Sequence, residues 1–309
     1  MNLIDLFSGC GGFSKGFLDQ GFNILGAIEN FKPAVETYIY NIKAKVWMED
    51  IKRVPPKAFD KFIGEEKVDL IIGSPPCEPF TKANPLIRDR VEDRLYKDKR
   101  GILTLTFIEY VKYFSQKNED LIFIMENVPQ IKELKSELKE LFGEVGFKIY
   151  FNLLRAEHYG NPSIRARMFI SNIKLKPKKG KKVVVEEALK DIPKDAKNHE
   201  IKKLSKDKLE KIKRLKWGEA LYRFRGKSKV MQNWIRLHPK KLAPTVKGKV
   251  RFIHPYEDRL LTVREQARLM SYPDDFVFFG GREVQYNQIG ESVPPCLSRA
   301  IANYLKVRA

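Results

Sequence analysis

The stretch Val68-Asp-Leu-Ile-Ile-Gly-Ser-Pro-Pro-Cys-Glu-Pro-Phe80 decides the fold. Apart from one aspartate, residues 68–72 are apolar and mostly β-branched, which is typical of a central strand covered on both faces. Pro75 and Pro76 fix their own φ angles and cannot continue a sheet, so the chain leaves at the carboxyl edge of this strand. Ligands of open α/β sheets bind at that edge. Cys77 is therefore a candidate for a reactive thiol, and the alternative is a buried structural cysteine.

Strand and helix patterns alternate through the first half of the chain. Strand patterns are found at residues 3–7, 22–29, 68–73, 121–127, 148–154 and 168–173. Helical patterns follow the first Gly-rich turn and Pro33, and occupy residues 102–114 and 131–145. This alternation predicts an α/β fold with a doubly wound, mainly parallel sheet.

The 309 residues suffice for one large domain with an appended lobe, or for two domains. The net charge of +20 is unevenly spread, because residues 174–251 hold 27 Lys and Arg against 8 Asp and Glu. The rest of the chain is nearly balanced, with 32 basic and 31 acidic residues. Such one-sided charge favours a surface that binds nucleic acid. The alternative is a solvated, lysine-rich surface of the kind found in heat-adapted proteins.

The segment KLKPKKGKK at residues 174–182 indicates an exposed connector. Beyond it strand signals are sparse until about Trp234, and the composition is basic with scattered aromatic residues. We therefore expect a small separate lobe at residues 175–250. Residues 1–174 form the expected catalytic domain, and residues 251–309, with helical patterns at 261–270 and 298–305, return to it.

The compartment is expected to be the cytoplasm. No apolar stretch is long enough to span a membrane, and the chain begins directly with a strand pattern rather than a leader sequence. Cys10, Cys77 and Cys296 lie far apart, without a CxxC pair or a histidine cluster. We therefore expect neither a disulfide framework nor a metal site.

A Gly-rich turn follows the first strand pattern. Gly9, Gly11 and Gly12 allow a tight turn and a close approach of the backbone to a ligand at a helix N-terminus. Glu29 ends the second strand pattern, 20 residues after Gly9, where a carboxylate can accept hydrogen bonds from ribose hydroxyls. The spacing is not GxGxxG, so adenosine without a pyrophosphate fits better than NAD. Asp50 is a candidate for the adenine amino group, or else a plain surface acid.

Two further strand ends carry polar side chains. Glu126 comes directly after the apolar run LIFIM, where a carboxylate could donate a proton, although an N-cap or turn acid fits equally well. Arg165 and Arg167 enter the last strand pattern at i and i+2, so we expect them on one face. Their guanidinium donors could hold a phosphate or a carbonyl oxygen, and the alternative is an exposed strand edge.

The order and spacing of six segments resemble the motif series of the cytosine-5 DNA methyltransferases. The segments are DLFSGCGGFS, GSPPCEPF, ENV, RARMFI, LTVREQARLMSYPDDF and QYNQIGESVPP. Arg100-Gly-Ile-Leu103 resembles one more motif, and the match runs from Asn2 to about Leu305, lapsing only in the basic lobe. The resemblance implies a Rossmann-like methyltransferase fold that uses S-adenosylmethionine, with an inserted basic target-recognition lobe.

The resemblance also implies a mechanism on cytosine in double-stranded DNA. Cys77 would be the nucleophile that adds to carbon 6, so that carbon 5 takes a methyl group from S-adenosylmethionine. Glu126 would protonate ring N3 or hydrogen bond to it. Arg165 and Arg167 would hold the base carbonyl and help to keep the thiol ionised. The target base would have to flip out of the duplex to reach this pocket.

By the same match, the following residues would line the cofactor site: Phe7, Gly9, Gly11, Gly12, Glu29, Asn30, Asp50, Ile51, Pro76, Leu103 and Ser292. The charged stretch Lys82 to Arg100 would close over the substrate, and the alternative is a plain surface loop.

Three positions depart from the family pattern. Glu78 and Ser163 stand where the family usually has Gln, and Glu291 stands where it usually has Asn. The last departure puts one cofactor or cytosine contact in doubt, because an ionised carboxylate cannot donate a hydrogen bond. No catalytic group is removed.

One alternative is a cytosine-5 methyltransferase that acts on transfer RNA. The Cys-Phe-Thr signature of that branch is absent from the basic lobe. A second alternative, a catalytically silent nucleic-acid-binding protein, fits poorly with the retained Cys77, Glu126 and both arginines. We expect a monomer associated with the nucleoid through DNA binding, and a cognate restriction endonuclease is a further candidate partner.

Overall fold

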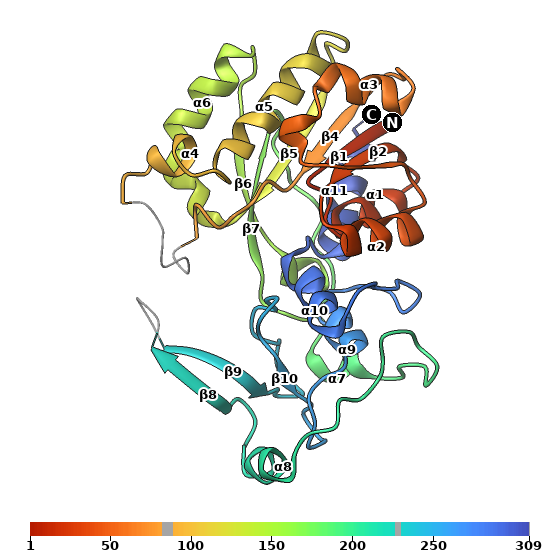
Figure 1. Cartoon of the computed structure of the whole chain (residues 1–309), viewed down its shortest axis with the longest axis vertical. Helices are drawn as coiled ribbons and strands as arrows, with labels where there is room; N and C mark the ends of the chain where they lie inside the picture. The colour runs from red at the N-terminus through yellow and green to blue at the C-terminus, as the bar shows by residue number, and fades with distance from the viewer. Residues whose placement is uncertain (82–88, 226–229, 309) are drawn as a thin grey trace. The chain divides into compact units, whose positions relative to one another are not determined.

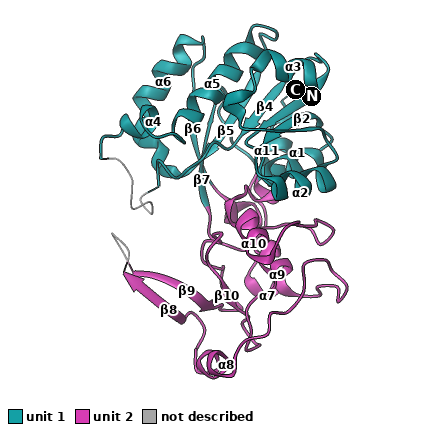
Figure 2. Ribbon diagram, viewed as in Figure 1, with its two compact units in different colours: residues 1–154, 166–177, 298–309 teal, residues 155–165, 178–297 magenta. Residues whose placement is uncertain are grey.

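The structure, a computed structural model, describes residues 1–81, 89–225 and 230–308 (Figure 1). The chain forms two compact units (Figure 2). Unit 1 comprises residues 1–154, 166–177 and 298–309, and unit 2 comprises residues 155–165 and 178–297. The expected division into a catalytic domain and a lobe at residues 175–250 stays a prediction.

Unit 1 is built on a seven-stranded sheet of order β3-β2-β1-β4-β5-β7-β6. Its strands are β1 (Asn2–Leu6), β2 (Asn23–Glu29), β3 (Val46–Met48), β4 (Leu70–Gly73), β5 (Ile122–Asn127), β6 (Tyr150–Arg155) and β7 (Ala166–Ser171). The neighbours from β3 to β5 pair in parallel, and β5 pairs with β7 in antiparallel fashion. The predicted α/β fold with a mainly parallel sheet is confirmed. The short strand β3 had no sequence signal.

Helices cover both faces of this sheet. They are α1 (Gly12–Leu18), α2 (Lys32–Ile42), α3 (Pro56–Ile63), α4 (Asp93–Tyr96), α5 (Ile102–Ser115), α6 (Lys135–Glu144) and α11 (Pro295–Lys306), with the 3-10 turns η1 (Ile51–Arg53) and η2 (Pro129–Leu134). The connections from β1 through β2 to β3 contain α1 and α2, and those from β3 through β4 to β5 contain α3 and α5. Because each crossover is right-handed and the two sets run in opposite directions along the sheet, their helices lie on opposite faces. The packing agrees, because α1 contacts α2 whereas α3 contacts α5. The helix expected at 131–145 is in fact η2 followed by α6.

The main core of unit 1 lies between the sheet and the α3–α5 layer. It is dominated by aromatic rings, and Phe123 of β5 stacks on Phe142 of α6 with ring centroids 4.8 Å apart. The ring of Phe107 in α5 packs edge to face against Phe123, with ring centroids 6.4 Å apart. The apolar strands, whose pattern predicted a sheet covered on both faces, thus pack against large aromatic rings. No helix in the described part of the chain is both long and apolar enough to cross a membrane.

Unit 2 holds a smaller sheet of order β10-β9-β8 (Figure 2). Its elements are η3 (Ala156–Tyr159), α7 (Val185–Leu189), α8 (Lys206–Lys213), β8 (Ala220–Arg225), β9 (Val230–Arg236), β10 (Phe252–Ile253), α9 (Val263–Arg268) and α10 (Arg282–Glu291). One small apolar cluster of unit 2 consists of Ile212, Ile253 and Leu260, and further apolar residues of this unit are fully buried, among them Leu269, Met270 and Ile289. Buried arginines supplement it: Arg264 is fully buried and donates to the carbonyls of Lys197, Pro273 and Phe276.

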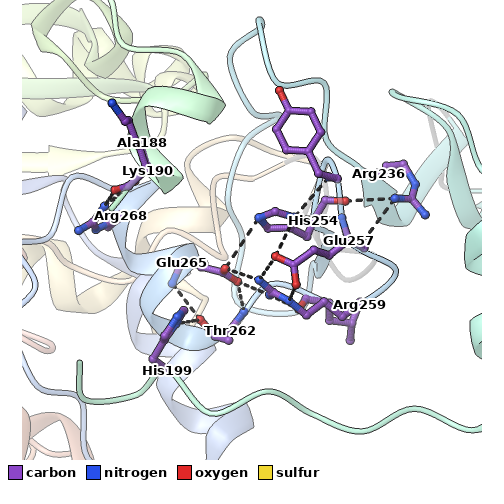
Figure 3. Close-up of polar contacts among 12 residues, drawn as sticks. Ala188, Lys190, His199, Arg236, His254, Glu257, Arg259, Thr262, Glu265 and Arg268 are labelled. Carbon is purple, nitrogen blue, oxygen red and sulfur yellow. Dashed lines mark hydrogen bonds and ion pairs between the residues drawn. The ribbon is translucent and has the colours of Figure 1, made fainter. Parts of the chain in front are cut away.

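Polar contacts also organise the segment around α9 (Figure 3). Thr262 caps the helix, and its backbone N–H donates to the Glu265 carboxylate at 2.7 Å. Arg259 binds both oxygens of Glu265 at 2.7 Å, and it also pairs with Glu257. These bonds lower the pKa of Glu265 against the opposing effect of its burial, and they keep it charged in unit 2.

Candidate active site

Two of the predicted motifs meet where β1 and β4 end side by side. Leu6 pairs with Gly73, and the Ser74 N–H donates to the Leu6 carbonyl at 3.2 Å. From this point β1 continues into the Gly-rich turn, and β4 continues into the Pro-Pro-Cys turn. The strand order reverses here, and open α/β sheets bind ligands at such switch points.

The turn after β1 has an unusual backbone. Phe7 adopts a φ of 60°, Gly9 of 53° and Gly11 of 92°, all in the left-handed region. A side chain at Gly11 would meet Tyr38 and Ile42 at 2.9 Å, whereas a Cβ at Gly9 would meet nothing within 4 Å. Gly11 therefore serves tight packing onto α2. Gly9 leaves its backbone open to an approaching ligand, and Gly12 begins α1.

Glu29 lies across from this turn at the end of β2. Its Oε2 atom accepts the Gly9 N–H at 2.9 Å, and its Oε1 atom accepts the N–H groups of Asn30 and Phe31 at 2.9 Å. Burial raises the pKa of Glu29, although the three backbone donors oppose the rise. The carboxylate is thus fixed beside the open backbone of Gly9, where it can accept further hydrogen bonds.

Most of the other predicted cofactor residues of unit 1 also follow strand ends, and Leu103 lies near the start of helix α5. Asp50 comes two residues after β3 and caps η1 by accepting the Lys52 N–H at 3.1 Å. Ile51 is buried, and Leu103 of α5 packs against the same core cluster, as does Phe7. Pro76 is half-buried ahead of Cys77. Carboxylates and open backbone thus line one edge of the sheet, where ligands of open α/β sheets bind.

The turn that carries Cys77 is held from both sides. Pro75 is buried, and its carbonyl accepts the Asn127 Nδ2 donor at 3.0 Å. The Cys77 carbonyl accepts the N–H groups of Phe80 and Thr81, both at 3.0 Å. Cys77 itself is half-buried and packs on the main core. These contacts fix the backbone of the turn that carries the thiol.

Glu126 and Arg167 form an ion pair next to this turn. Because β7 runs antiparallel to β5, it begins where β5 ends, which brings Arg167 to Glu126. Their Nε and Oε1 atoms are 2.9 Å apart, and the side chains are only 16% and 8% exposed. Arg167 also donates to the Ala166 carbonyl at 2.8 Å. A buried carboxylate with a guanidinium partner can exchange a hydrogen bond or a proton with a neighbouring ring nitrogen.

Arg165 and Ser292 belong to unit 2. The Arg165 side chain is fully buried, and its two terminal nitrogens donate to the carbonyls of Val246 at 3.0 Å and Ser292 at 2.7 Å. Since β7 begins at Ala166, only Arg167 of the two arginines lies in a strand. Arg165 directly precedes this strand, so the expectation that both arginines point to one face stays a prediction, as does the role of Arg165 at the base.

The structure describes part of the expected closing loop and the three positions that depart from the family pattern. Residues 82–88 of the expected closing loop lie outside the described residues. Its far end is anchored, because Arg94 of α4 pairs with Glu133 at 2.7 Å. Ser163 is buried and donates to the Leu269 carbonyl at 2.9 Å, which is a structural use of that position. Glu78 is exposed beside Cys77, and Glu291 ends α10.

The sequence patterns did not reveal two polar features near the site. One is the Asn127 bond to Pro75. The other is a buried network in which Ser14 donates to Asp5 at 2.6 Å and lies 2.7 Å from the Tyr38 hydroxyl. Burial raises the pKa of Asp5 to about 8, which favours the protonated form of this carboxyl at neutral pH. The signal in the sequence for this network was Asp5, an acid within the otherwise apolar strand pattern of residues 3–7. The residues described include no cluster of His, Cys, Asp or Glu that could hold a metal ion.

Comparison with known proteins identifies the family. The sequence model of the C-5 cytosine-specific DNA methylases matches residues 1–307. The chain belongs to this family. A protein of Methanocaldococcus jannaschii, provisionally named a type II methyltransferase, is 80% identical over 99% of both chains. The type II methyltransferase M.DdeI of Desulfomicrobium norvegicum is 32% identical and covers 98% of this chain and 88% of its own.

The crystal structure of a protein from an E. coli prophage, provisionally described as a DNA modification methyltransferase, has a TM-score of 0.80. It is 26% identical and covers 99% of both chains. The S. pombe Dnmt2 methyltransferase has the same fold, with a TM-score of 0.69 at 18% identity over 100% of this chain and 99% of its own. The protein is thus a DNA (cytosine-5-)-methyltransferase.

Proposed function

We propose that this methyltransferase moves a methyl group from S-adenosylmethionine to carbon 5 of a flipped-out cytosine in double-stranded DNA, through a covalent adduct with Cys77. The observation that carries the proposal is the bond from Asn127 to the Pro75 carbonyl. It ties the turn that holds the thiol to the strand end that holds Glu126. A nucleophile and an acid fixed in this way are what addition to a pyrimidine ring requires.

The proposed reaction assigns a step to each residue. The Cys77 thiolate adds to carbon 6 while Glu126 gives a proton or hydrogen bond to N3, which draws the negative charge out of the ring. S-adenosylmethionine supplies an electrophilic methyl group, and carbon 5 takes it. The donor leaves as the neutral thioether. A water molecule then takes the carbon 5 proton, the thiolate is expelled, and N3 returns its proton or hydrogen bond to Glu126, which restores the aromatic ring. Arg167 holds Glu126 in place, and Arg165 is proposed to hold the base carbonyl.

The donor is proposed to bind along the carboxyl ends of β1 to β4. Glu29 would accept ribose hydroxyls, and Asp50 would accept the adenine amino group. Open backbone at Gly9 would let the donor approach closely, which its empty Cβ position supports. The remaining contacts are proposed from Phe7, Gly11, Gly12, Asn30, Ile51, Pro76, Leu103 and Ser292.

DNA is favoured over transfer RNA as the substrate. The family is named for the methylation of cytosine in DNA. The basic segment of this chain, residues 174–251, lies mostly in unit 2. Relatives named as type II methyltransferases make a companion restriction endonuclease a reasonable partner to test. We propose that the enzyme acts as a monomer on nucleoid DNA in the cytoplasm.

The test is labelling with radioactive S-adenosylmethionine on duplex DNA and on transfer RNA side by side, followed by bisulfite mapping of the DNA. The proposal expects label in DNA at carbon 5 of cytosine and none in transfer RNA. The Cys77→Ser variant serves as the inactive control. Label confined to transfer RNA, or labelled DNA in which bisulfite converts every cytosine, would refute the assignment to carbon 5 of cytosine in DNA.

A further inference from the structure

The outer part of β8 and β9 forms a two-stranded ribbon. The strands pair in antiparallel fashion from Ala220 opposite Ile235 to Arg225 opposite Val230. The third strand, β10, pairs with β9 only at Ile235 and Arg236 (Figure 1). Among the described residues, 222–225 and 230–233 therefore have only each other as strand partners. A two-stranded ribbon is one of the few elements that fit into the major groove of DNA.

One face of this ribbon carries hydrogen-bonding side chains. Arg223 lies directly opposite Gln232, and Arg225 lies opposite Val230. Since strand side chains alternate, these four share one face, and the exposed rings of Tyr222 and Phe224 lie on the other. Arg223, Arg225 and Gln232 are all exposed.

These side chains are not used to hold unit 2 together. Within the part of the chain that the structure describes, the side chains of Arg223 and Arg225 have no hydrogen bond or ion pair, in contrast to the side chains of the other arginines around this sheet. Arg236 donates to the Ile212 carbonyl at 2.9 Å and pairs with Asp258 at 2.5 Å. Arg251 donates to the Gly248 carbonyl at 2.6 Å. Two guanidinium groups thus remain available on an exposed ribbon.

Two neighbouring lysines of α8 have ion-pair partners, unlike the arginines of the ribbon. Lys211 pairs with Asp207 at 2.9 Å, and Lys213 pairs with Glu210 at 2.7 Å. Their charge is partly compensated within the helix. The ribbon arginines carry uncompensated charge and the planar donor fork that matches a base edge.

The spacing of the ribbon matches that of base pairs. Side chains at i and i+2 on a strand are roughly 6.7 Å apart, and two base-pair steps rise about 6.8 Å. Arginine binds guanine through O6 and N7, and glutamine binds adenine through N6 and N7. We propose that this face reads the recognition sequence, with Arg223 and Arg225 on guanines about two base pairs apart and Gln232 on an adjacent adenine. This inference rests on the proposed activity on double-stranded DNA.

The experiment maps sequence preference. The full-length enzyme methylates a library of duplexes with randomised bases around one cytosine, and bisulfite sequencing gives the preferred bases at each position. Wild type is compared with Arg223→Ala, Arg225→Ala and Gln232→Ala. The matched control is Arg214→Ala, which removes an exposed arginine of unit 2 from the end of α8, outside the ribbon.

The proposal expects each ribbon variant to relax the preference at one position by about 5- to 150-fold, the discrimination that one bidentate pairing with a base provides. The arginine variants should relax guanine positions, and the control should keep the wild-type pattern. An unchanged pattern in all three variants overturns the proposal, as does an equal loss of activity on every sequence, which indicates phosphate contacts. If wild type methylates no cytosine in the library but labels transfer RNA, the proposed function fails, and the inference falls with it.

Discussion

The side-chain amide of Asn127 donates a 3.0 Å hydrogen bond to the backbone carbonyl of Pro75, across two neighbouring parallel strands. Asn127 is buried, and its Oδ1 atom accepts the Val128 N–H at 2.8 Å, so both ends of the amide are used. This one side chain fixes the end of β5 relative to the turn that leads to Cys77. The positions of the proposed acid and the proposed nucleophile are therefore coupled.

Replacing Asn127 with Ala should impair both stability and chemistry. The buried Pro75 carbonyl loses its donor, which should lower the free energy of unfolding by about 1–3 kcal/mol. The thiol also loses a positional restraint, which should lower the single-turnover rate by about 10- to 100-fold. Urea unfolding and rapid-quench methylation measure the two effects.

Asn172→Ala is the matched control. Asn172 bonds to the Leu121 carbonyl at 2.8 Å and to the Phe123 N–H at 3.1 Å, at the opposite end of β5. This variant should lose stability and keep its single-turnover rate. Equal rates in the two variants would mean that the Asn127 bond is structural only.

Glu126→Gln should lower the rate of the chemical step by about 10²–10⁴-fold, because an amide cannot supply a proton to N3. The side chain keeps its shape and one oxygen that can still accept the bond from Arg167, so folding should be retained. The dissociation constant of S-adenosylmethionine, measured by titration calorimetry, should barely change. Weakened donor binding together with normal single-turnover chemistry would assign Glu126 to the cofactor instead.

Glu29→Ala should weaken S-adenosylmethionine binding by about 1.5–3 kcal/mol, the contribution of hydrogen bonds to a charged acceptor. Since burial raises the pKa of Glu29, the carboxylate accepts hydrogen bonds only above that raised value. Donor affinity of wild type should therefore fall as the pH decreases through the raised pKa and recover as it increases. Glu29→Gln should show no such dependence. Calorimetry over a pH series that finds parallel curves for both proteins would place the donor elsewhere.

DNA binding should depend steeply on salt, because lysines release condensed counterions from phosphates. Lys202, Lys203 and Lys206 are exposed near the start of α8 and have no acid partner among the described residues. Neutralising all three should flatten the logarithmic salt dependence by about 0.9 for each phosphate that the protein no longer neutralises. Filter binding on cognate and random duplexes measures the slope.

The paired lysines provide the comparison for that experiment. Lys211 and Lys213 already bind Asp207 and Glu210, so neutralising these two should change the slope less per residue. A slope that is the same for wild type and for the triple variant would mean that this lysine-rich segment is only solvated.

The elements that were predicted correctly are those with a buried face. The patterns around β1, β2, β4 and β5 are apolar runs, and each run became a strand of the main sheet. The ribbon strand β8 gave no clear signal, because Tyr222 to Arg225 alternates rings with arginines and buries neither face. Strand β3 has three residues, too few for a pattern.

The same physical reason governs what could be predicted of the site. Glu126 and the Gly-rich turn stand out because they interrupt apolar strands at their ends. The Asn127 contact with Pro75 joins residues 52 positions apart, and no local pattern encodes such a pairing. Likewise the ion pair of Glu126 with Arg167 depends on the antiparallel placement of β7, which strand patterns alone do not specify.

Covalent trapping tests the role of Cys77 most directly. Duplex DNA that contains 5-fluorocytosine at the target position should form a denaturation-resistant complex with wild type when S-adenosylmethionine is present, because the fluorine at carbon 5 cannot leave as a proton does. Cys77→Ser should form none, since a hydroxyl is a far weaker nucleophile at neutral pH. Cys296→Ser, which removes another half-buried thiol, should trap like wild type. Equal trapping by Cys77→Ser, or none by wild type on DNA that it methylates when unfluorinated, would contradict the assignment of Cys77 as the nucleophile.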